Sequence, residues 1–325
     1  MHSDDGNVVL EGLKNTVNLL LIVHVFKTPA ERFEISNHII RIFDLIVNSN
    51  LINKICYILG NTENPNILWE CLKIVTIFAP GPRIANTPET SILHPSQMFH
   101  KILLGNNGVV QSCLKLTQSN CIEVKEQAVL AVGFLVRNSA DIRDLIVSLG
   151  GVQVLCDSIN TESPISLVQR MSLTLSLIAA VPNRKGESML SAELSKTTLS
   201  LVQAFSWLLF WKDDIDILSN SLLGLSYLLP QIELNFSNTS IWERAVKMLT
   251  HNNVLVKRSA LYCLKTIVLN NELQCQYCVE QKMLVLLSEL LHFANANVRV
   301  EACDLITLLA NRGYAWVSSF FVGHN

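Results

Sequence analysis

Apolar residues recur at three- and four-residue steps along several long segments of the chain. This is the spacing of an amphipathic helix, because positions i, i+3, i+4 and i+7 share one face. The pattern predicts longer helices over residues 126–136, 169–179, 220–229, 258–269 and 301–309. A less regular N-terminal part predicts three helices over residues 35–47, 51–59 and 68–78. The sequence therefore predicts an all-α chain.

Two segments of the chain match each other at a fixed distance. Gly108 and Cys113 recur as Gly151 and Cys156, 43 residues later. A period of this size is typical of a helical solenoid. Such repeats cannot bury their apolar faces alone, so they stack and present a long surface instead of a deep pocket. This architecture favours binding over catalysis.

Two segments interrupt the repeats. Residues 80–95 hold four of the nine prolines and no periodic apolar face, so we expect a surface insert near residues 80–100. A milder insert is expected near residues 182–195. Because a loop without an apolar face adds little to a core, the first insert should be removable without unfolding the chain.

Residues 126–134 read EQAVLAVGF and residues 141–151 read DIRDLIVSLGG. These segments resemble an armadillo repeat of the importin-alpha (karyopherin-alpha) family. The likeness continues through LTLS at 173–176, LGLSYL at 223–228 and EAC at 301–303, and covers most of residues 35–320. The resemblance implies one right-handed superhelical solenoid over residues 1–325, with about seven repeats.

In that family the third helix of each repeat lines a concave groove. A tryptophan, and an asparagine one turn later, hold an extended lysine-rich nuclear localisation signal. The resemblance implies that the tryptophan positions here are Lys73, Leu130, Leu173, Leu223, Tyr262 and Asp304. It places the asparagine positions at Ile77, Phe134, Leu177, Tyr227, Thr266 and Leu308. These twelve residues are the candidate partner-binding residues.

The replacements change the chemistry of the groove. Leucine can cover a lysine stem but offers no ring quadrupole for its charge, and Ile77, Phe134 and Leu177 cannot bond a peptide backbone. We therefore expect a hydrophobic ligand, either a partner helix or an extended chain. The resemblance also implies a basic N-terminal arm that binds importin-beta, but residues 1–33 hold only three basic residues. Binding of importin-beta through this chain alone is not expected.

Composition narrows the class of partner and the compartment. Half of the residues are hydrophobic, 16% are charged, and the mean hydropathy is +0.34, as expected for helices buried between neighbours. A net charge of −2 without a basic stretch argues against nucleic acid. The acidic start and the short apolar runs argue against a signal peptide or a membrane span. Nine cysteines within helical apolar patterns indicate buried free thiols in a reducing compartment, and so the cytoplasm, the nucleus or both.

No cluster of residues in the sequence favours an enzyme or a metal protein. It has no glycine-rich phosphate loop, nucleophile elbow or His-Glu-x-x-His helix, so we expect neither enzymatic activity nor a cofactor. Cys275 and Cys278 have CxxC spacing, but packing at helix positions i and i+3 explains the pair better than a zinc site. Cys113 and Cys156 occupy equivalent repeat positions, which favours a role in the core.

A cluster of aromatic residues ends one apolar segment at Phe205, Trp207, Phe210 and Trp211. Rings on all sides of a helix favour burial between repeats over an exposed partner site. The acidic residues that follow, Asp213, Asp214 and Asp216, favour a solvated loop with helix caps over a site for a basic peptide.

Two functions remain open from the sequence. The first is an importin-alpha-like adaptor that binds a nuclear transport cargo in its groove. The second is an armadillo scaffold in a non-transport assembly that has lost recognition of nuclear localisation signals. The overall repeat match favours transport, whereas the replaced tryptophan and asparagine positions favour a scaffold.

Overall fold

The computed structural model describes residues 3–22, 51–79, 108–137, 139–180, 191–229, 239–270 and 283–311. The regular elements within these ranges are helices, and no described residue lies in a strand. The chain divides into two compact units, Met1–Asn183 and Arg184–Asn325. We describe each unit by itself.

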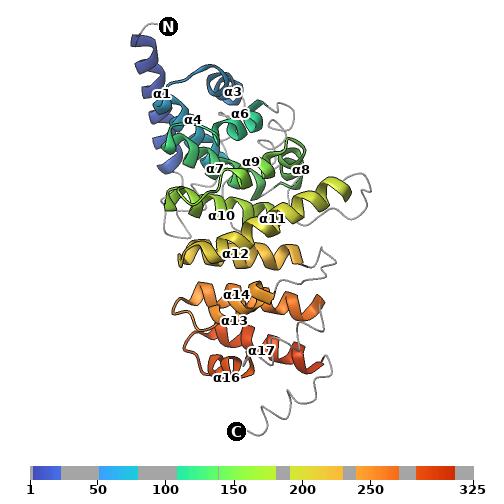
Figure 1. Ribbon diagram of the computed structural model, residues 1–325. Helices are drawn as coiled ribbons and strands as arrows, with labels where there is room; N and C mark the ends of the chain where they lie inside the picture. The colour runs from blue at the N-terminus through green and yellow to red at the C-terminus, as the bar shows by residue number, and fades with distance from the viewer. Residues whose placement is uncertain are drawn as a thin grey trace, which may run out of the picture. The chain divides into compact units, whose positions relative to one another are not determined.

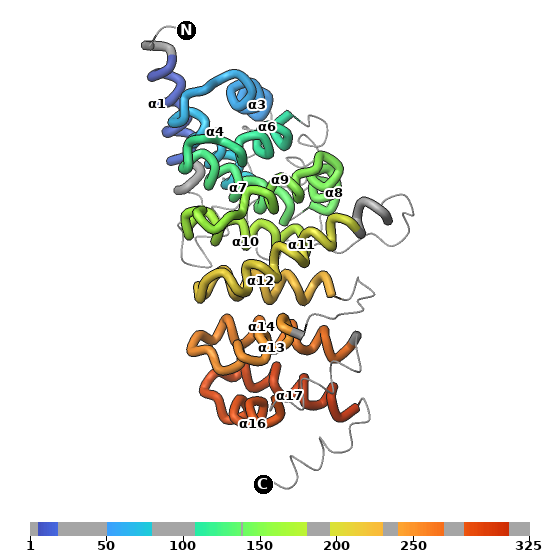
Figure 2. The backbone as a smooth tube through the Cα atoms, viewed as in Figure 1, coloured from blue at the N-terminus to red at the C-terminus, as the bar shows by residue number. Residues whose placement is uncertain are grey.

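The first unit is built from one series of helices that pack on each other in order. Helix α1 packs on α4, α4 on α7, and α7 on α10, as Figures 1 and 2 show. Shorter helices pack on this series and on one another, as α3 contacts α4 and α6, α6 contacts α7, and α9 contacts α8 and α10. The helices are α1 (Ser3–Ile22), α3 (Leu51–Asn61), α4 (Pro65–Phe78), α6 (Gly108–Leu116), α7 (Ile122–Arg137), α8 (Ala140–Ser148), α9 (Gly151–Asp157) and α10 (Ile165–Ala180).

The second unit repeats this plan. Helix α12 packs on α14, and α14 packs on α17, while α11 contacts both α12 and α13. Its helices are α11 (Ser191–Trp211), α12 (Ile215–Leu228), α13 (Thr239–Met248), α14 (Val254–Asn270), α16 (Leu284–Leu291) and α17 (Ala296–Asn311). We call the seven helices of the two series the stacking helices: α1, α4, α7, α10, α12, α14 and α17.

Polar caps set the start of four stacking helices. Asn64, Asp214, Asn253 and Asn295 each stand directly before a helix and accept a backbone N–H of its first turn through their side-chain oxygen. Such a cap satisfies one of the helix's unpaired amides. The confirmed role of Asp214 as a cap also explains why acidic residues gather in that loop.

The helices expected from the apolar pattern are confirmed within the described residues, but their starts are wrong. Each predicted stacking helix begins three to five residues earlier than the sequence pattern placed it. The earlier turn carries buried apolar residues, such as Val124, Ile217 and Val298, each the third residue of its helix. Helix α1 was not predicted, although Leu13 and Val17 on it are buried. The predicted helix over 35–47 lies outside the described residues.

The two proposed inserts fall largely outside the described residues. Residues 80–107 are not described, and neither are residues 181–190. Residues 191–195, which we had assigned to the second insert, form the start of α11. The single solenoid over residues 1–325 stays a prediction.

The stacking helices approach each other closely where a glycine removes a side chain. A Cβ atom on Gly133 of α7 would lie 2.6 Å from the hydroxyl of Thr174 on α10. That hydroxyl donates to the backbone oxygen of Val129 across the two helices, at 2.9 Å. In the second unit, a Cβ on Gly224 of α12 would collide with the ring of Phe205 on α11. These contacts fix the spacing of the layers.

We expect Gly224→Ala to lower the free energy of unfolding by about 1 to 3 kcal/mol, because the added methyl group overpacks the ring of buried Phe205. The control is Gly60→Ala on α3, where no atom lies within 4 Å of the new methyl group. Better helix propensity should make this control more stable by about 0.5 to 1 kcal/mol. Chemical denaturation of both variants measures the difference, and equal stabilities would contradict the packing.

Candidate functional site

Four apolar side chains stand partly exposed on one face of the first unit. Leu130 and Phe134 lie on α7, and Leu173 and Leu177 lie on α10. Each is partly accessible to solvent, whereas the residues directly before and after each of them are buried. We call these four residues the apolar ladder. The ladder is an apolar part of α7 and α10 that reaches solvent.

The packing of α7 on α10 brings the members of the ladder to the same level. The hydrogen bond from Thr174 to the backbone oxygen of Val129 joins the residues adjacent to Leu173 and Leu130. Phe134 and Leu177 follow one turn later on the same faces, since residues four apart in a helix lie one above the other. Two apolar pairs therefore stand side by side.

Helix α4 continues this face with different chemistry. Lys73 and Ile77 are both partly exposed there. The Lys73 ammonium lies 4.2 Å from the centroid of the Trp69 ring and 3.3 Å from Glu70 Oε2. Trp69 and Glu70 were not among the predicted site residues, although the i, i+4 and i, i+3 spacings could have indicated both contacts with Lys73.

The charged groups beside the apolar ladder pair with each other. Arg170 Nε lies 3.1 Å from Glu126 Oε2 across α10 and α7, and Ser166 donates to the other oxygen of the same carboxylate. Gln127 donates to the Thr76 hydroxyl at 2.9 Å, which ties α7 to α4. Each of these side chains thus has its partner on a neighbouring helix of the same chain. The ladder is therefore bordered by charges that are already neutralised.

The second unit places its candidate residues on α12, α14 and α17. Leu223, Tyr262, Thr266 and Leu308 are partly exposed, and Tyr227 and Asp304 are more exposed. This face is more polar than the apolar ladder and carries two tyrosines. These residues belong to the second unit, which is described separately from the first. That the candidate residues of both units form one continuous apolar track along the solenoid stays a prediction.

Most asparagine positions cannot bond a peptide backbone. Ile77, Phe134, Leu177 and Leu308 have no polar side-chain atom. The Thr266 hydroxyl contacts the backbone oxygens of Tyr262, at 3.1 Å, and of Ser226, at 3.3 Å. A ligand must therefore gain its affinity on this face from apolar burial and side-chain contacts.

The expectation that the aromatic cluster on α11 is buried is wrong for two of its rings. Phe205 is fully buried, but Trp207 is 38% exposed and Phe210 is 53% exposed. Trp207 stacks on Trp211 with centroids 5.6 Å apart. Helix α11 contacts α12 and α13, and the rings spaced around it divide between core and solvent.

The described cysteines are free thiols, as expected, with one exposed. Burial raises the pKa of Cys71, Cys113 and Cys156 to about 12, so these thiols stay protonated at neutral pH. Cys303 is exposed, contrary to the expected burial. Residues 275–278, with the CxxC spacing, lie outside the described residues. Elsewhere in the described ranges, no three metal-ligating side chains gather.

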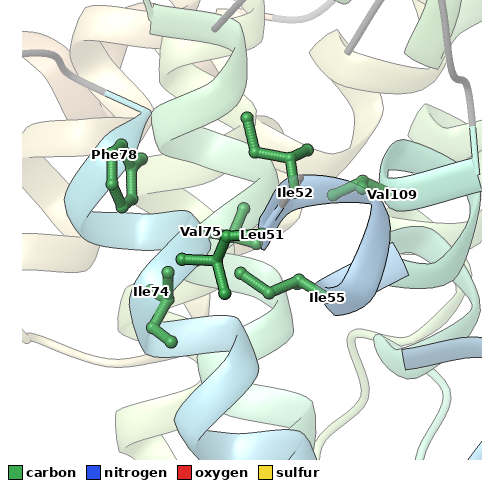
Figure 3. Close-up of a pocket in the computed structure, with 7 residues that line it drawn as sticks. All are labelled: Leu51, Ile52, Ile55, Ile74, Val75, Phe78 and Val109. Carbon is green, nitrogen blue, oxygen red and sulfur yellow. The ribbon is translucent and has the colours of Figure 1, made fainter. Parts of the chain in front are cut away.

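One small hollow lies within the first unit between α3, α4 and α6. It is lined by aliphatic and aromatic residues, and Figure 3 shows Val75 of α4 directed toward Ile55 of α3. The lining offers no nucleophile and no proton donor or acceptor on a side chain. Among the helices that the structure describes, none is long and apolar enough to cross a membrane.

Comparison with known proteins places this geometry in context. No protein-family model matches the chain. The chain is 24% identical to importin subunit alpha-1b of Oryza sativa subsp. japonica over 307 residues, 93% of this chain and 50% of that protein. It is also 24% identical to importin subunit alpha-3 of Arabidopsis thaliana over 262 residues, 79% of this chain and 45% of that protein. The chain spans about half the length of these relatives.

Solved structures agree with the fold. An engineered protein matches with a TM-score of 0.66 at 19% identity, covering 82% of this chain and 98% of its own. A designed armadillo repeat protein in complex with the peptide (KR)4 matches with a TM-score of 0.63 at 16% identity, covering 79% and 98%. The chain is a divergent armadillo-repeat protein. Its sequence is similar to importin alpha subunits.

We expect this armadillo-repeat protein to bind a lysine-rich peptide such as (KR)4 only weakly. Each tryptophan position is replaced, and each lost cation–π contact removes about 0.5 to 1 kcal/mol where it is exposed. Fluorescence anisotropy with a labelled peptide measures the affinity, with a designed armadillo protein that binds (KR)4 as the positive control. A low-micromolar or tighter dissociation constant would contradict the expectation.

Proposed function

We propose that the protein is a non-enzymatic armadillo-repeat protein that binds a segment of another protein on its stacking helices. The apolar ladder is the observation that carries this proposal. Leu130, Phe134, Leu173 and Leu177 are accessible although the residues beside them are buried. Contiguous apolar side chains on a soluble surface usually mark an interaction site.

The chemistry of the ladder selects the kind of segment. Its four side chains offer no hydrogen bonds, and the flanking charges of Glu126 and Arg170 pair with each other. A ligand that buries leucine-like side chains gains roughly 25 cal/mol per Å² of apolar surface removed from water. A highly charged ligand would lose hydration without finding a partner charge on the ladder. A hydrophobic segment, as a helix or an extended chain, fits this face best.

The similarity to importin alpha subunits favours a nuclear transport cargo as the partner, with the protein in the cytoplasm and the nucleus. The replaced lysine-binding positions favour the alternative, an armadillo scaffold in another assembly. Affinity purification with the intact protein separates the two functions. Transport factors or import cargoes that require the ladder support transport, and partners of another class that require it support a scaffold.

We expect the double substitution Phe134→Asp and Leu177→Asp to weaken the binding of a hydrophobic segment by more than about 10-fold, because two carboxylates would be buried against apolar groups. The probe is the tightest 16-residue peptide selected from a random display library on the intact protein. Binding is measured by titration calorimetry, and folding by circular dichroism. The fold should stay nearly intact, because both side chains already reach solvent.

The matched control is Tyr57→Asp with Ile165→Asp, which adds the same charge at exposed positions of the same unit away from the ladder. It should leave the affinity within about twofold. If the ladder variant unfolds, its side chains belong to the core and the ladder is not a surface. If both double variants bind the peptide equally, the segment binds elsewhere.

A further inference from the structure

A lysine of the chain is enclosed by an aromatic ring and two carboxylates in the second unit. Lys265 Nζ on α14 lies 2.5 Å from Glu301 Oε2 and 3.2 Å from Asp304 Oδ2 on α17. The same ammonium lies 5.2 Å from the centroid of the Tyr262 ring. Tyr262 and Asp304 are two of the candidate partner-binding residues. The enclosed lysine therefore sits within the candidate face.

A ring face together with carboxylates is the environment that holds an ammonium or guanidinium ion in proteins. Here α14 supplies the tyrosine ring and the lysine, and α17 supplies the two carboxylates. Burial alone would lower the pKa of Lys265, but its hydrogen bonds with Glu301 and Asp304 outweigh burial and raise the pKa. The side chain is thus a cation throughout the neutral pH range.

We propose that Lys265 fills a cation-binding site on the stacking helices and thereby excludes lysine and arginine side chains of a ligand from it. The inference rests on the proposed function, in which this face binds a protein segment. Beyond that function, it specifies that segments rich in lysine or arginine bind poorly to this face. Lys265 is a specificity-determining residue that acts against basic segments.

The first unit holds a related arrangement, in which the ring, the lysine and one carboxylate all lie on α4. Lys73 lies over the ring of Trp69 and contacts Glu70, as described above, and it occupies a tryptophan position itself. Glu70 is almost fully buried, and its carboxylate contacts Lys73. Two lysines, one in each unit, therefore pair with acidic groups beside the candidate residues.

An internal lysine competes well against a ligand. It is tethered beside the site, so it acts at a high effective concentration, which for a short link is in the millimolar range. An incoming cation must also break both contacts of Lys265 before it gains its own. A site filled in this way weakens the binding of basic ligands. Specificity can arise from such penalties against unwanted ligands as well as from favourable contacts with the correct one.

The test compares variants of the intact protein with labelled (KR)4 as the probe. Lys265→Met keeps an apolar stem but frees Glu301, Asp304 and the Tyr262 ring. It should bind the peptide at least about 10-fold more tightly than the unmodified protein. Lys265→Gln, which can still hydrogen-bond both carboxylates, is the second variant should the methionine variant fail to fold. It should show a gain in the same direction.

The control is Lys247→Met on α13, which makes the same change in net charge at an exposed position away from the face. It should change the affinity by less than about twofold. Adding both Glu301→Gln and Asp304→Asn to Lys265→Met should remove most of the gain, because these substitutions remove both carboxylates of the site. An equal gain in Lys247→Met and Lys265→Met, or a gain that survives the removal of both carboxylates, would overturn the proposal.

The library-selected hydrophobic peptide separates this inference from the proposed function. Its affinity should be unchanged in Lys265→Met, because the apolar ladder is untouched. If that peptide binds but the lysine variants gain no affinity for (KR)4, the inference fails and the proposed function stands. If no hydrophobic peptide binds the ladder while (KR)4 gains affinity, the proposed function fails and the cation site stands.

Discussion

The packing of each stacking helix on the next is the constraint on which the rest of the structure depends. A helix such as α7 buries residues against α4 on one side and α10 on the other, and Gly133 lets α10 approach to contact distance. Burial on these sides leaves a strip on which Leu130 and Phe134 are partly exposed between buried neighbours. Because every repeat is held in the same way, the strips of adjacent helices align. The candidate face is therefore a consequence of how the core is made.

What stands on that strip decides what the protein can bind. In the first unit it is aliphatic and aromatic, with Glu126 and Arg170 paired beside it. In the second unit it carries tyrosines and a lysine held by two carboxylates. Both compositions disfavour a lysine-rich ligand, one because it lacks cation-binding groups and the other because its own lysine occupies them.

The helices and their order could be predicted from the sequence because apolar periodicity records which side of a helix is buried. Helix starts were placed too late, since the first buried residue after the cap Asp214 is Ile217, and the exposed Ile215 and Asp216 between them hid the first turn from the apolar pattern. Burial of Trp207 could not be judged, because it depends on which side of α11 meets α12. The resemblance located the candidate positions, but the pairing of Lys265 with a helix 36 residues later needed the three-dimensional structure.

Hydrogen–deuterium exchange of the intact protein, with and without the selected hydrophobic peptide, tests the central claim most directly. The account predicts slower exchange in α7 and α10, because a segment on the apolar ladder suppresses local opening of the helices that carry it. Exchange in α11, whose exposed Trp207 and Phe210 offer another apolar surface, should be unchanged. Protection confined to α11, with α7 and α10 unaffected, would contradict the account.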